Sequence, residues 1–267
     1  MSHYPLITLT TDFGLTDEYV ASMKGVIYTI LPEARIVDIC HSIPPQDVAS
    51  ASFIFGRAYS YFPHGTVHII VVDPGVGSAR SILAIEAGGQ FFIAPDNGTL
   101  SAVLERHKNV KLYTISNTKL YRENTTSTFH GRDIMAPVAA RVAGGLSLSE
   151  TGKRIQPEDC VKLDDYTPHV QSDSIHGKVI HIDNFGNICT NITSSLIKNL
   201  GSNQTILIKI GDVHIHGLAS SYAVAEPNQP LALYDSHNHL EIAINCGSAA
   251  ENLHIARGDT VSVHITQ

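Results

Sequence analysis

The feature that most constrains the fold is an apolar run that ends in a charged turn. Residues 69–72 are all β-branched, and Asp73, Pro74 and two glycines follow them. Such a run is typical of a strand that is covered on both faces, as in a parallel sheet. Ligands bind at the carboxyl ends of these strands, so Asp73 and Arg80, seven residues later, form a candidate site. The alternative is a turn that Asp73 caps and Arg80 closes with an ion pair.

Strands and helices alternate over the first part of the chain. Leu6 to Thr10 is apolar and β-branched, and the polar turn that follows makes Asp12 a second carboxylate at a strand's carboxyl end. The order predicts an α/β domain with a mostly parallel sheet and flanking helices. Its next elements are a helix over 19–31, a strand over 34–39, a helix over 47–61 and a strand over 67–72.

His130 stands at the start of a later helix. A hairpin is predicted over 82–94 and a strand over 110–115, and residues 125–130 are polar and irregular. Gly131 then opens an apolar helix that ends at Gly144. A helix dipole lowers the pKa of an imidazole at the N-terminus, so we expect His130 to be neutral and able to act as a base.

The composition changes near residue 160. Short β-type segments, separated by Gly, Asn and Pro turns, replace the alternation with helices. This pattern predicts a second, smaller domain, an antiparallel sheet or barrel. We expect the α/β domain over 1–165 and the β domain over 172–267, with strands at 174–183, 205–210, 213–218, 230–234, 240–244 and 260–265.

Charge and cysteine content narrow the class of protein. The net charge of −7 and the pI near 6.1 disfavour partners such as nucleic acid or a membrane surface, which need a concentrated basic face. The four cysteines form no Cys-x-x-Cys pair, which favours reduced thiols over disulfides or a zinc site. The N-terminus has neither a basic nor an apolar leader segment, and no apolar run is long enough to span a membrane. We therefore expect a soluble, cytoplasmic protein.

Several familiar catalytic motifs are absent. Gly75-Val76-Gly77 lacks the third glycine of a dinucleotide fingerprint, and the chain has neither a P-loop Gly-Lys-Ser/Thr nor a Gly-x-Ser-x-Gly elbow. The pairs His214/His216 and His237/His239 would each lie on one face of a strand, but no third ligand stands at a recognisable spacing. We expect no metal and no cofactor.

Six ordered motifs nevertheless span nearly the whole chain. They are Thr10-Thr11-Asp12-Phe13-Gly14, Val71-Val72-Asp73-Pro74-Gly75-Val76-Gly77 with Arg80, Pro95-Asp96-Asn97-Gly98, Thr128-Phe129-His130-Gly131-Arg132-Asp133, Asp183 with Phe185-Gly186-Asn187, and Leu240-Glu241-Ile242-Ala243-Ile244-Asn245. Together they resemble the S-adenosyl-L-methionine hydroxide adenosyltransferases, relatives of bacterial fluorinase and chlorinase. The resemblance implies a catalytic triad of Asp73, Arg80 and His130.

The same resemblance implies a set of substrate-binding residues. Tyr19, Gln46 and His237 differ from the serine, tryptophan and arginine that fluorinase has there. The implied roles are Asp12 on the ribose hydroxyls, Asn187 on the adenine edge, Tyr222 on an adenine face, Asp183 and Ser236 on the methionine end, and Tyr19 and Gln46 along the substrate.

The implied reaction is attack of water or hydroxide on C5′ of S-adenosylmethionine, which gives adenosine and L-methionine. The resemblance further implies a homotrimer with its sites at subunit interfaces. Three alternatives stay open. Gly131, at the halide-pocket position, favours a halide-dependent transferase; Asp12, Asp73, Asp96 and His130 would suit a metal-dependent phosphoesterase; and an adenosine or S-adenosylmethionine sensor would bind without turnover.

Overall fold

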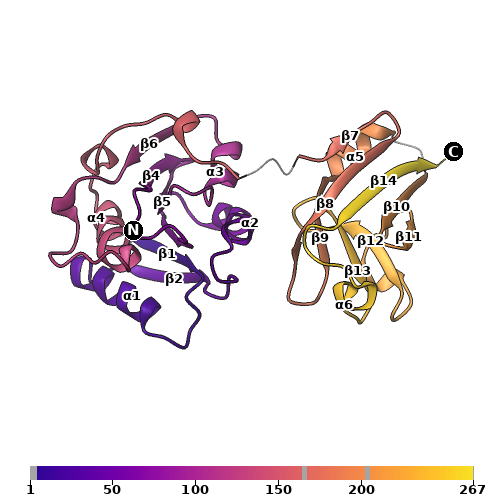
Figure 1. Ribbon diagram of the computed structural model, residues 1–267, viewed down its shortest axis with the longest axis horizontal. Helices are drawn as coiled ribbons and strands as arrows, with labels where there is room; N and C mark the ends of the chain where they lie inside the picture. The colour runs from indigo at the N-terminus through magenta and orange to yellow at the C-terminus, as the bar shows by residue number, and fades with distance from the viewer. Residues whose placement is uncertain (1–4, 164–166, 202–204, 267) are drawn as a thin grey trace. The chain divides into compact units, whose positions relative to one another are not determined.

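The chain forms two domains that divide after Leu163 (Figure 1). The structure is a computed structural model that describes residues 5–163, 167–201 and 205–266. The N-terminal domain holds an α/β sheet, and the C-terminal domain is built mainly from antiparallel strands. This confirms the fold class that the sequence predicts.

A six-stranded sheet is the centre of the N-terminal domain, in the order β2-β1-β3-β5-β4-β6. The first four strands in this order pair in parallel, and β4 alone runs antiparallel to both of its neighbours. The carboxyl ends of β1 and β3 therefore lie side by side, with Thr11 opposite Val71. The strands are β1 (Leu6–Thr11), β2 (Arg35–Cys40), β3 (Val67–Val71), β4 (Ile82–Ala87), β5 (Gln90–Pro95) and β6 (Val110–Thr114).

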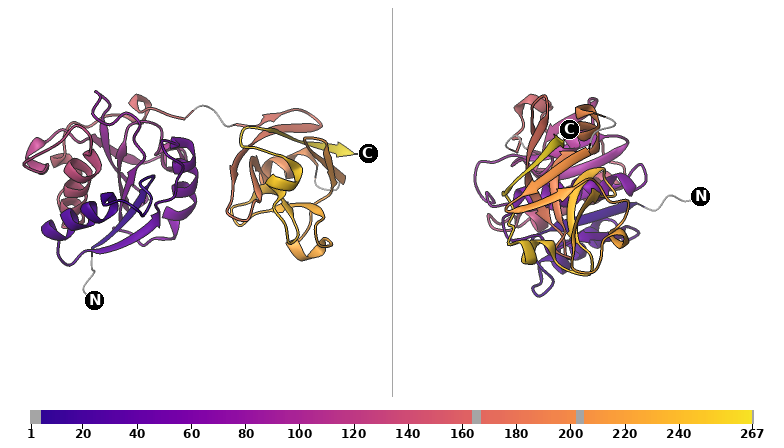
Figure 2. Two further views of the ribbon diagram at one scale, coloured as in Figure 1. Left: turned by 60° about the horizontal axis from the view of Figure 1, so that its bottom comes forward. Right: turned by 90° about the vertical axis from the view of Figure 1, so that its right-hand side faces the viewer.

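Helices cover both faces of this sheet (Figure 2). On β3, Ile69 and Val71 join the core that includes α1 and α4, whereas Ile70 joins the opposite core, which includes α2 and α3. All three side chains are buried, as predicted for a strand covered on both faces. The helices are α1 (Tyr19–Ile30), α2 (Val48–Ala58), α3 (Ser101–Arg106) and α4 (Ala136–Ala143), with short 3₁₀ turns at Tyr59–Tyr61, Thr118–Leu120, Leu148–Glu150 and Pro157–Asp159.

The C-terminal domain is one antiparallel sheet in the order β11-β10-β14-β8-β9-β13-β12, with β7 added beside β8. The two end strands, β11 and β12, contact each other, so that the sheet almost closes into a barrel. Its strands are β7 (His169–Val170), β8 (Ser174–Ile182), β9 (Ile188–Thr193), β10 (Thr205–Ile210), β11 (Val213–His216), β12 (Pro230–Tyr234), β13 (His239–Ile244) and β14 (Thr260–Thr266). Two short helices, α5 (Ser194–Leu200) and α6 (Ala249–Leu253), and a 3₁₀ turn at Tyr222–Val224 complete it.

Strands β7 and β9 are the strands of this domain that the sequence pattern did not predict, and helix α6 was not predicted either. In β9, the polar residues Thr190 and Asn191 interrupt the apolar pattern from which a buried strand is predicted. The structure buries both, because Thr190 Oγ1 donates to the Leu240 carbonyl at 2.8 Å and Asn191 Oδ1 accepts the Lys178 backbone N–H at 2.7 Å. Buried polar groups with such partners cost little, so a strand of this composition can lie inside the sheet.

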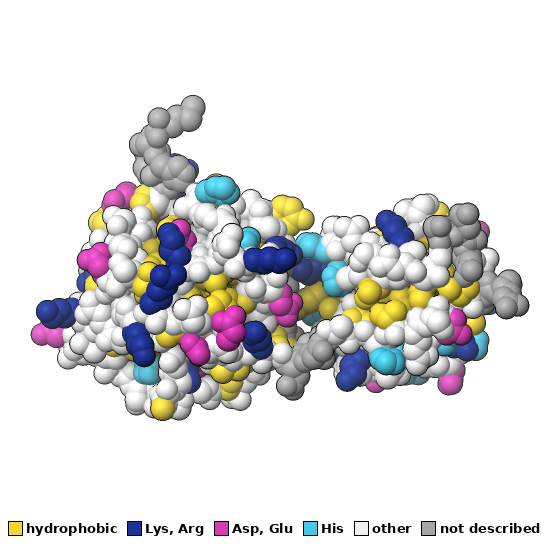
Figure 3. Space-filling model, turned by 90° about the horizontal axis from the view of Figure 1, so that it is seen from above, with side chains coloured by type: hydrophobic (Ala, Val, Ile, Leu, Met, Phe, Trp, Pro, Cys, Tyr) yellow, Lys and Arg dark blue, Asp and Glu magenta, His cyan; other side chains and the backbone are white. Residues whose placement is uncertain are grey.

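Basic and acidic side chains are interspersed on the face of the N-terminal domain seen in Figure 3, where no large area of a single sign appears. Within the described ranges, no helix combines the length and the apolar character needed to cross a membrane.

Candidate active site

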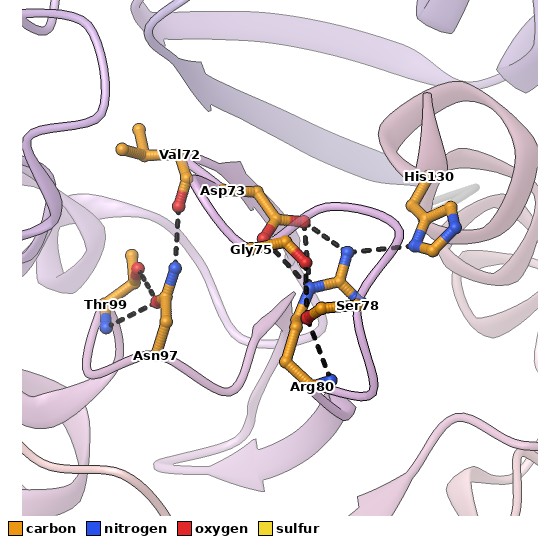
Figure 4. Close-up of polar contacts among 8 residues, drawn as sticks. All are labelled: Val72, Asp73, Gly75, Ser78, Arg80, Asn97, Thr99 and His130. Atoms are coloured by element: carbon orange, nitrogen blue, oxygen red, sulfur yellow. Dashed lines mark hydrogen bonds and ion pairs between the residues drawn. The ribbon is translucent and has the colours of Figure 1, made fainter. Parts of the chain in front are cut away.

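Three predicted site residues form one hydrogen-bonded chain just beyond the end of β3 (Figure 4). Arg80 Nε donates to the two carboxylate oxygens of Asp73 at 2.9 and 3.0 Å, and its Nη2 donates to Asp73 Oδ2. The same Nη2 lies 2.9 Å from Nδ1 of His130. The side chains of Asp73 and Arg80 are only 5% and 11% exposed. The alternative reading, an ion pair that merely closes a turn, does not account for the third residue.

The loop after β3 folds back so that Arg80 reaches Asp73. The backbone N–H of Val76 donates to the Asp73 carbonyl at 3.1 Å, and Ser78 Oγ donates to the Gly75 carbonyl at 2.7 Å. Ser78 Oγ also accepts the N–H of Arg80, at 3.2 Å. These successive turns reverse the chain within the six residues that separate Asp73 from Arg80.

Asn97 anchors the strand end from the neighbouring loop (Figure 4). Its Nδ2 donates to the Val72 carbonyl at 2.8 Å, and its Oδ1 accepts the backbone N–H of Thr99 at 3.2 Å. The Pro95-Asp96-Asn97-Gly98 motif therefore fixes the backbone immediately before Asp73.

His130 directly precedes a π-helical turn, Gly131–Met135, that continues into α4. Because a guanidinium can only donate, Nδ1 of His130 must be the unprotonated acceptor, and the ring proton of the neutral imidazole is on Nε2. Burial and the positive charge of Arg80 lower the pKa of His130, whereas Asp73 and Asp133 oppose this shift. Burial and Arg80 therefore favour the expected neutral imidazole.

Asp12 and Gln46 lie together beyond the carboxyl end of β1. Asp12 Oδ2 accepts the backbone N–H of Gln46 at 2.8 Å, and Gln46 has a φ of +65°. This left-handed conformation is uncommon for a residue with a side chain, and such conformations gather at binding sites. The exposed Gln46 side chain and the second oxygen of Asp12 remain available to a ligand.

Tyr19, at the start of α1, belongs to an aromatic cluster beside the triad. Its ring lies 5.4 Å from Phe13 and 5.2 Å from Phe129, the residue before His130. Tyr19 is 40% exposed, whereas Phe129 is buried. The cluster thus presents aromatic surface at the same edge of the sheet as Asp12 and Asp73.

In the C-terminal domain, Asp183 and Asn187 form one turn after β8. Asp183 Oδ1 accepts the backbone N–H groups of Phe185 and Asn187, both at 2.9 Å, and its Oδ2 accepts Nδ2 of Asn187 at 3.0 Å. This leaves one N–H and the carbonyl oxygen of the Asn187 side chain for a ligand. Asp183 orients Asn187, a link that the sequence did not predict.

Tyr222 and Ser236 make different local contacts in the same domain. Tyr222 Oη donates to Oε1 of the buried Glu241 at 2.6 Å, and Ser236 Oγ lies 3.1 Å from Nδ1 of His237. Burial, the hydrogen bond to Glu241 and nearby negative charges, including Asp183, raise the pKa of Tyr222. Tyr222 is therefore a neutral phenol held by a carboxylate.

Sequence reasoning did not single out Phe13, Phe129 or Glu241. The signal for Glu241 was a carboxylate inside an otherwise apolar strand, since a buried charge needs a partner. The signal for the two phenylalanines was their place inside the motifs that carry Asp12 and His130. Their mutual contact, at 5.6 Å between ring centroids, joins segments far apart in sequence, so it could not be predicted locally.

The metal-dependent alternative finds little support in this geometry. Arg80 occupies both oxygens of Asp73, and Asp96 Oδ1 accepts the Val161 backbone N–H at 2.9 Å. Among the described residues, one group of possible metal ligands has its atoms within 4.8 Å of one another, namely Cys189, Asp235 and Glu241. None of the residues suggested for a phosphoesterase belongs to this group.

Comparison with known proteins gives a family for both domains. Residues 7–152 match the model of the SAM hydroxide adenosyltransferase N-terminal domain, and residues 177–262 match that of the C-terminal domain. The chain is 34% identical to an (R)-S-adenosyl-L-methionine hydrolase of Salinispora tropica, over 98% of this chain and 99% of the relative. A fluorinase of Nocardia brasiliensis is 28% identical, over 98% and 97%.

A solved structure supports the same grouping. The crystal structure of an uncharacterised conserved protein from Thermotoga maritima matches with a TM-score of 0.90 and 36% identity, over 97% of this chain and 99% of that one. The chain belongs to the SAM hydroxide adenosyltransferase family.

Proposed function

We propose that this protein hydrolyses S-adenosyl-L-methionine to adenosine and L-methionine. The observation that carries the proposal is the unbroken hydrogen-bonded chain from Asp73 through Arg80 to His130, at the edge of a parallel sheet where ligands bind. The full-length relatives at 34% and 35% identity that are named (R)-S-adenosyl-L-methionine hydrolases support it.

The reaction needs an activated water but no acid for the leaving group, because the sulfonium departs as a neutral thioether. A water O–H bond breaks, the oxygen bonds to C5′, and the C5′–S bond breaks with its electron pair going to sulfur. Overall, the sulfonium cation and water give adenosine, methionine and one proton. Opposite charges cancel when hydroxide meets a sulfonium, so a site that solvates both poorly accelerates the step.

In the proposed mechanism, Arg80 and His130 break the hydrogen bond between them, and each then binds the reacting water. Nδ1 of His130 accepts the proton of the water only when Arg80 Nη2 stops donating to it. The released N–H of Arg80 then donates to the forming hydroxide, while Asp73 holds the guanidinium in place through Nε. The triad thus activates and stabilises the nucleophile in one movement.

The remaining residues bind the substrate in this proposal. Asp12 takes the ribose hydroxyls, Asn187 the adenine edge and Tyr222 an adenine face; Asp183, Ser236, Tyr19 and Gln46 bind or line the rest. We further propose a homotrimer in which each site lies at a subunit interface, with the α/β domain of one subunit beside the β domain of its neighbour. The four cysteines are free thiols, which supports our placing the protein in the cytoplasm.

The test is incubation of the purified protein with S-adenosylmethionine, followed by chromatography for adenosine and methionine. Because the relatives' names specify the (R) configuration at sulfur, the two sulfonium epimers should be assayed separately. Arms with chloride and with a chelator test the other reactions. Formation of 5′-chloroadenosine as the main product, chelator-sensitive turnover, or binding of S-adenosylmethionine with no product from either epimer would each contradict the proposal.

A further inference from the structure

Asp133, in the π-helical turn that follows His130, is a fully buried carboxylate. Five donors converge on its two oxygens. Oδ1 accepts Arg122 Nη1 at 2.9 Å and Arg132 Nε at 2.7 Å, and Oδ2 accepts Arg132 Nη2 at 3.0 Å together with the N–H and hydroxyl of Thr126 at 2.9 and 2.7 Å. Burial alone would raise the pKa of Asp133, but these hydrogen bonds outweigh it and lower the pKa.

These contacts close the segment 122–133 on itself. The backbone N–H of Arg122 donates to the Asp133 carbonyl at 2.9 Å, and the N–H of Asp133 donates to the Phe129 carbonyl at 3.0 Å. The guanidinium of Arg132 also lies over the Phe129 ring, 4.8 Å from its centroid. Arg132 thus contacts both the Phe129 ring and the Asp133 carboxylate. His130 lies in the chain between Phe129 and Asp133.

The same segment lies against the loop that carries Arg80. A Cβ built on Gly77 would be 2.4 Å from the carbonyl oxygen of Ser127, so the two loops touch there. Thr126, which Asp133 binds twice, is the residue before this contact. Asp133 therefore holds Phe129, the residue before His130, and the segment that contacts the Arg80 loop.

We propose that Asp133 is a positioning residue for the reaction: through Arg122, Thr126 and Arg132 it holds His130 within hydrogen-bond distance of Arg80. Asp133 does not itself contact the atoms that react. A displacement of about 1 Å at a catalytic group can cost on the order of 100-fold in rate. This positioning role rests on the proposed function only in the measurements of turnover.

The test replaces Asp133 by asparagine, which keeps the shape but turns an N–H₂ group toward the donors. We expect kcat to fall at least about tenfold with KM changed less than about threefold, the signature of a lost transition-state interaction. Glu86→Gln is the matched control, because Glu86 also carries an ion pair, to Lys111 at 3.0 Å, but lies in β4 outside the site. Its kcat should stay at the wild-type value.

A second measurement, titration of the His130 ring by NMR, does not depend on turnover. The groups that act on His130 are Arg80, Asp73 and Asp133, and burial and Arg80 are the larger influences. If Asp133→Asn releases the ring from its position, the pKa of His130 should rise toward about 6.5, the ordinary value. A purely electrostatic role would lower this pKa instead, because a neighbouring negative charge is lost.

Arg122→Leu keeps the test decisive should Asp133→Asn fail to fold. Arg122 is half-exposed and supplies one of the five donors, so this variant should fold and show a smaller fall in kcat, with a rise of the His130 pKa. Folded variants with normal kcat and an unchanged or lowered His130 pKa would overturn the proposal. A wild-type protein without turnover but with the expected pKa changes would contradict the proposed function and leave the positioning role standing.

Discussion

Arg80 donates from Nη2 to Nδ1 of His130 across 2.9 Å, and this single contact fixes which nitrogen of the imidazole carries the proton. In the resting arrangement the free electron pair of His130 faces a guanidinium, and Nε2–H faces elsewhere. His130 can therefore act as a base only in concert with a movement of Arg80. The two residues are expected to behave as one catalytic unit.

The first prediction concerns that unit. Arg80→Ala and His130→Ala should each lower kcat by about 10² to 10⁴, the usual effect of losing a positioned proton acceptor or its partner, with little change in substrate affinity. The double variant should be little worse than the poorer single one, because groups that act together are not additive. Steady-state kinetics and calorimetric titration on the same proteins check this.

Arg80→Lys is the matched control for charge. Lysine keeps the positive charge but cannot donate at once to Asp73 and His130, since it lacks the planar fork. We expect it to restore little of the lost kcat. Near-normal kcat in Arg80→Ala would remove Arg80 from the mechanism and leave a buried, turn-closing ion pair, whose loss should cost about 3 to 5 kcal/mol of stability because Asp73 would stay buried without its partner.

The second prediction is a pH profile. The pKa of His130 is lowered from about 6.5 by burial and Arg80, and only the neutral ring can accept a proton. Activity should therefore persist at pH 6.5 and be lost only as the pH falls through the lowered pKa. The dependence of kcat on pH measures this directly, and an acid limb centred above 6.5 would contradict the assignment.

The third prediction separates the purine contact from the methionine contact. Asn187→Ala should weaken adenosine binding by about tenfold or more, because it leaves polar groups of the purine unpaired, at a cost of about 1 to 3 kcal/mol. Ser236→Ala should leave adenosine affinity nearly unchanged. Calorimetry with adenosine alone compares them, and equal affinities would mean that the purine lies elsewhere.

The fourth prediction concerns the contact between the loop that carries Arg80 and the segment that carries His130. Gly77→Ala strains a residue at φ +80° and also pushes the Ser127 carbonyl away, so it should lower both the melting temperature and kcat. Gly145→Ala is the matched control, because Gly145 also has a positive φ, +104°, but no atom within 4 Å of the added Cβ. The control should lose about 1 kcal/mol of stability and keep its kcat.

The fifth prediction concerns stability. His68 is fully buried, hydrogen-bonded to Thr8 at 2.7 Å, and burial lowers its pKa to about 3. The unfolded chain binds a proton near pH 6.5 and the folded one does not, so the stability contribution present above 6.5 is lost as the pH falls toward 3, by up to about 1.4 kcal/mol per pH unit. Urea unfolding of wild type, His68→Gln and the exposed control His214→Gln at several pH values tests this, since only His68→Gln should flatten the dependence.

Local patterns carry most of the fold but only part of the site. The run before Asp73 predicted a strand buried on both faces because period and composition are local properties. The sequence did not predict strand β9, because its buried Thr190 and Asn191 form their hydrogen bonds with residues of other strands. The resemblance supplied Asp73, Arg80 and His130 as a set, whereas their hydrogen bonds depend on how two distant loops pack.

The same limit explains the supporting residues. Asp133 stood in a predicted motif, but its importance comes from five donors gathered by tertiary structure. Glu241 and Asp183 orient Tyr222 and Asn187 through contacts that sequence spacing does not encode. The sequence therefore predicted the residues that we propose contact the substrate, but it did not predict which residues position them.

The π-helical turn at Gly131–Met135 sets the direction in which the His130 side chain points relative to α4. Such a turn holds one residue more than an α-helical turn, and each residue of an α-helix advances the direction of its side chain by about 100°. Deleting one residue there would let the segment relax into continuous α-helix joined to α4. The core face of α4 could stay in place, while everything before the deletion would rotate by about that angle and carry the imidazole away from Arg80. The extra residue therefore sets the angle between the packed face of α4 and the imidazole of His130.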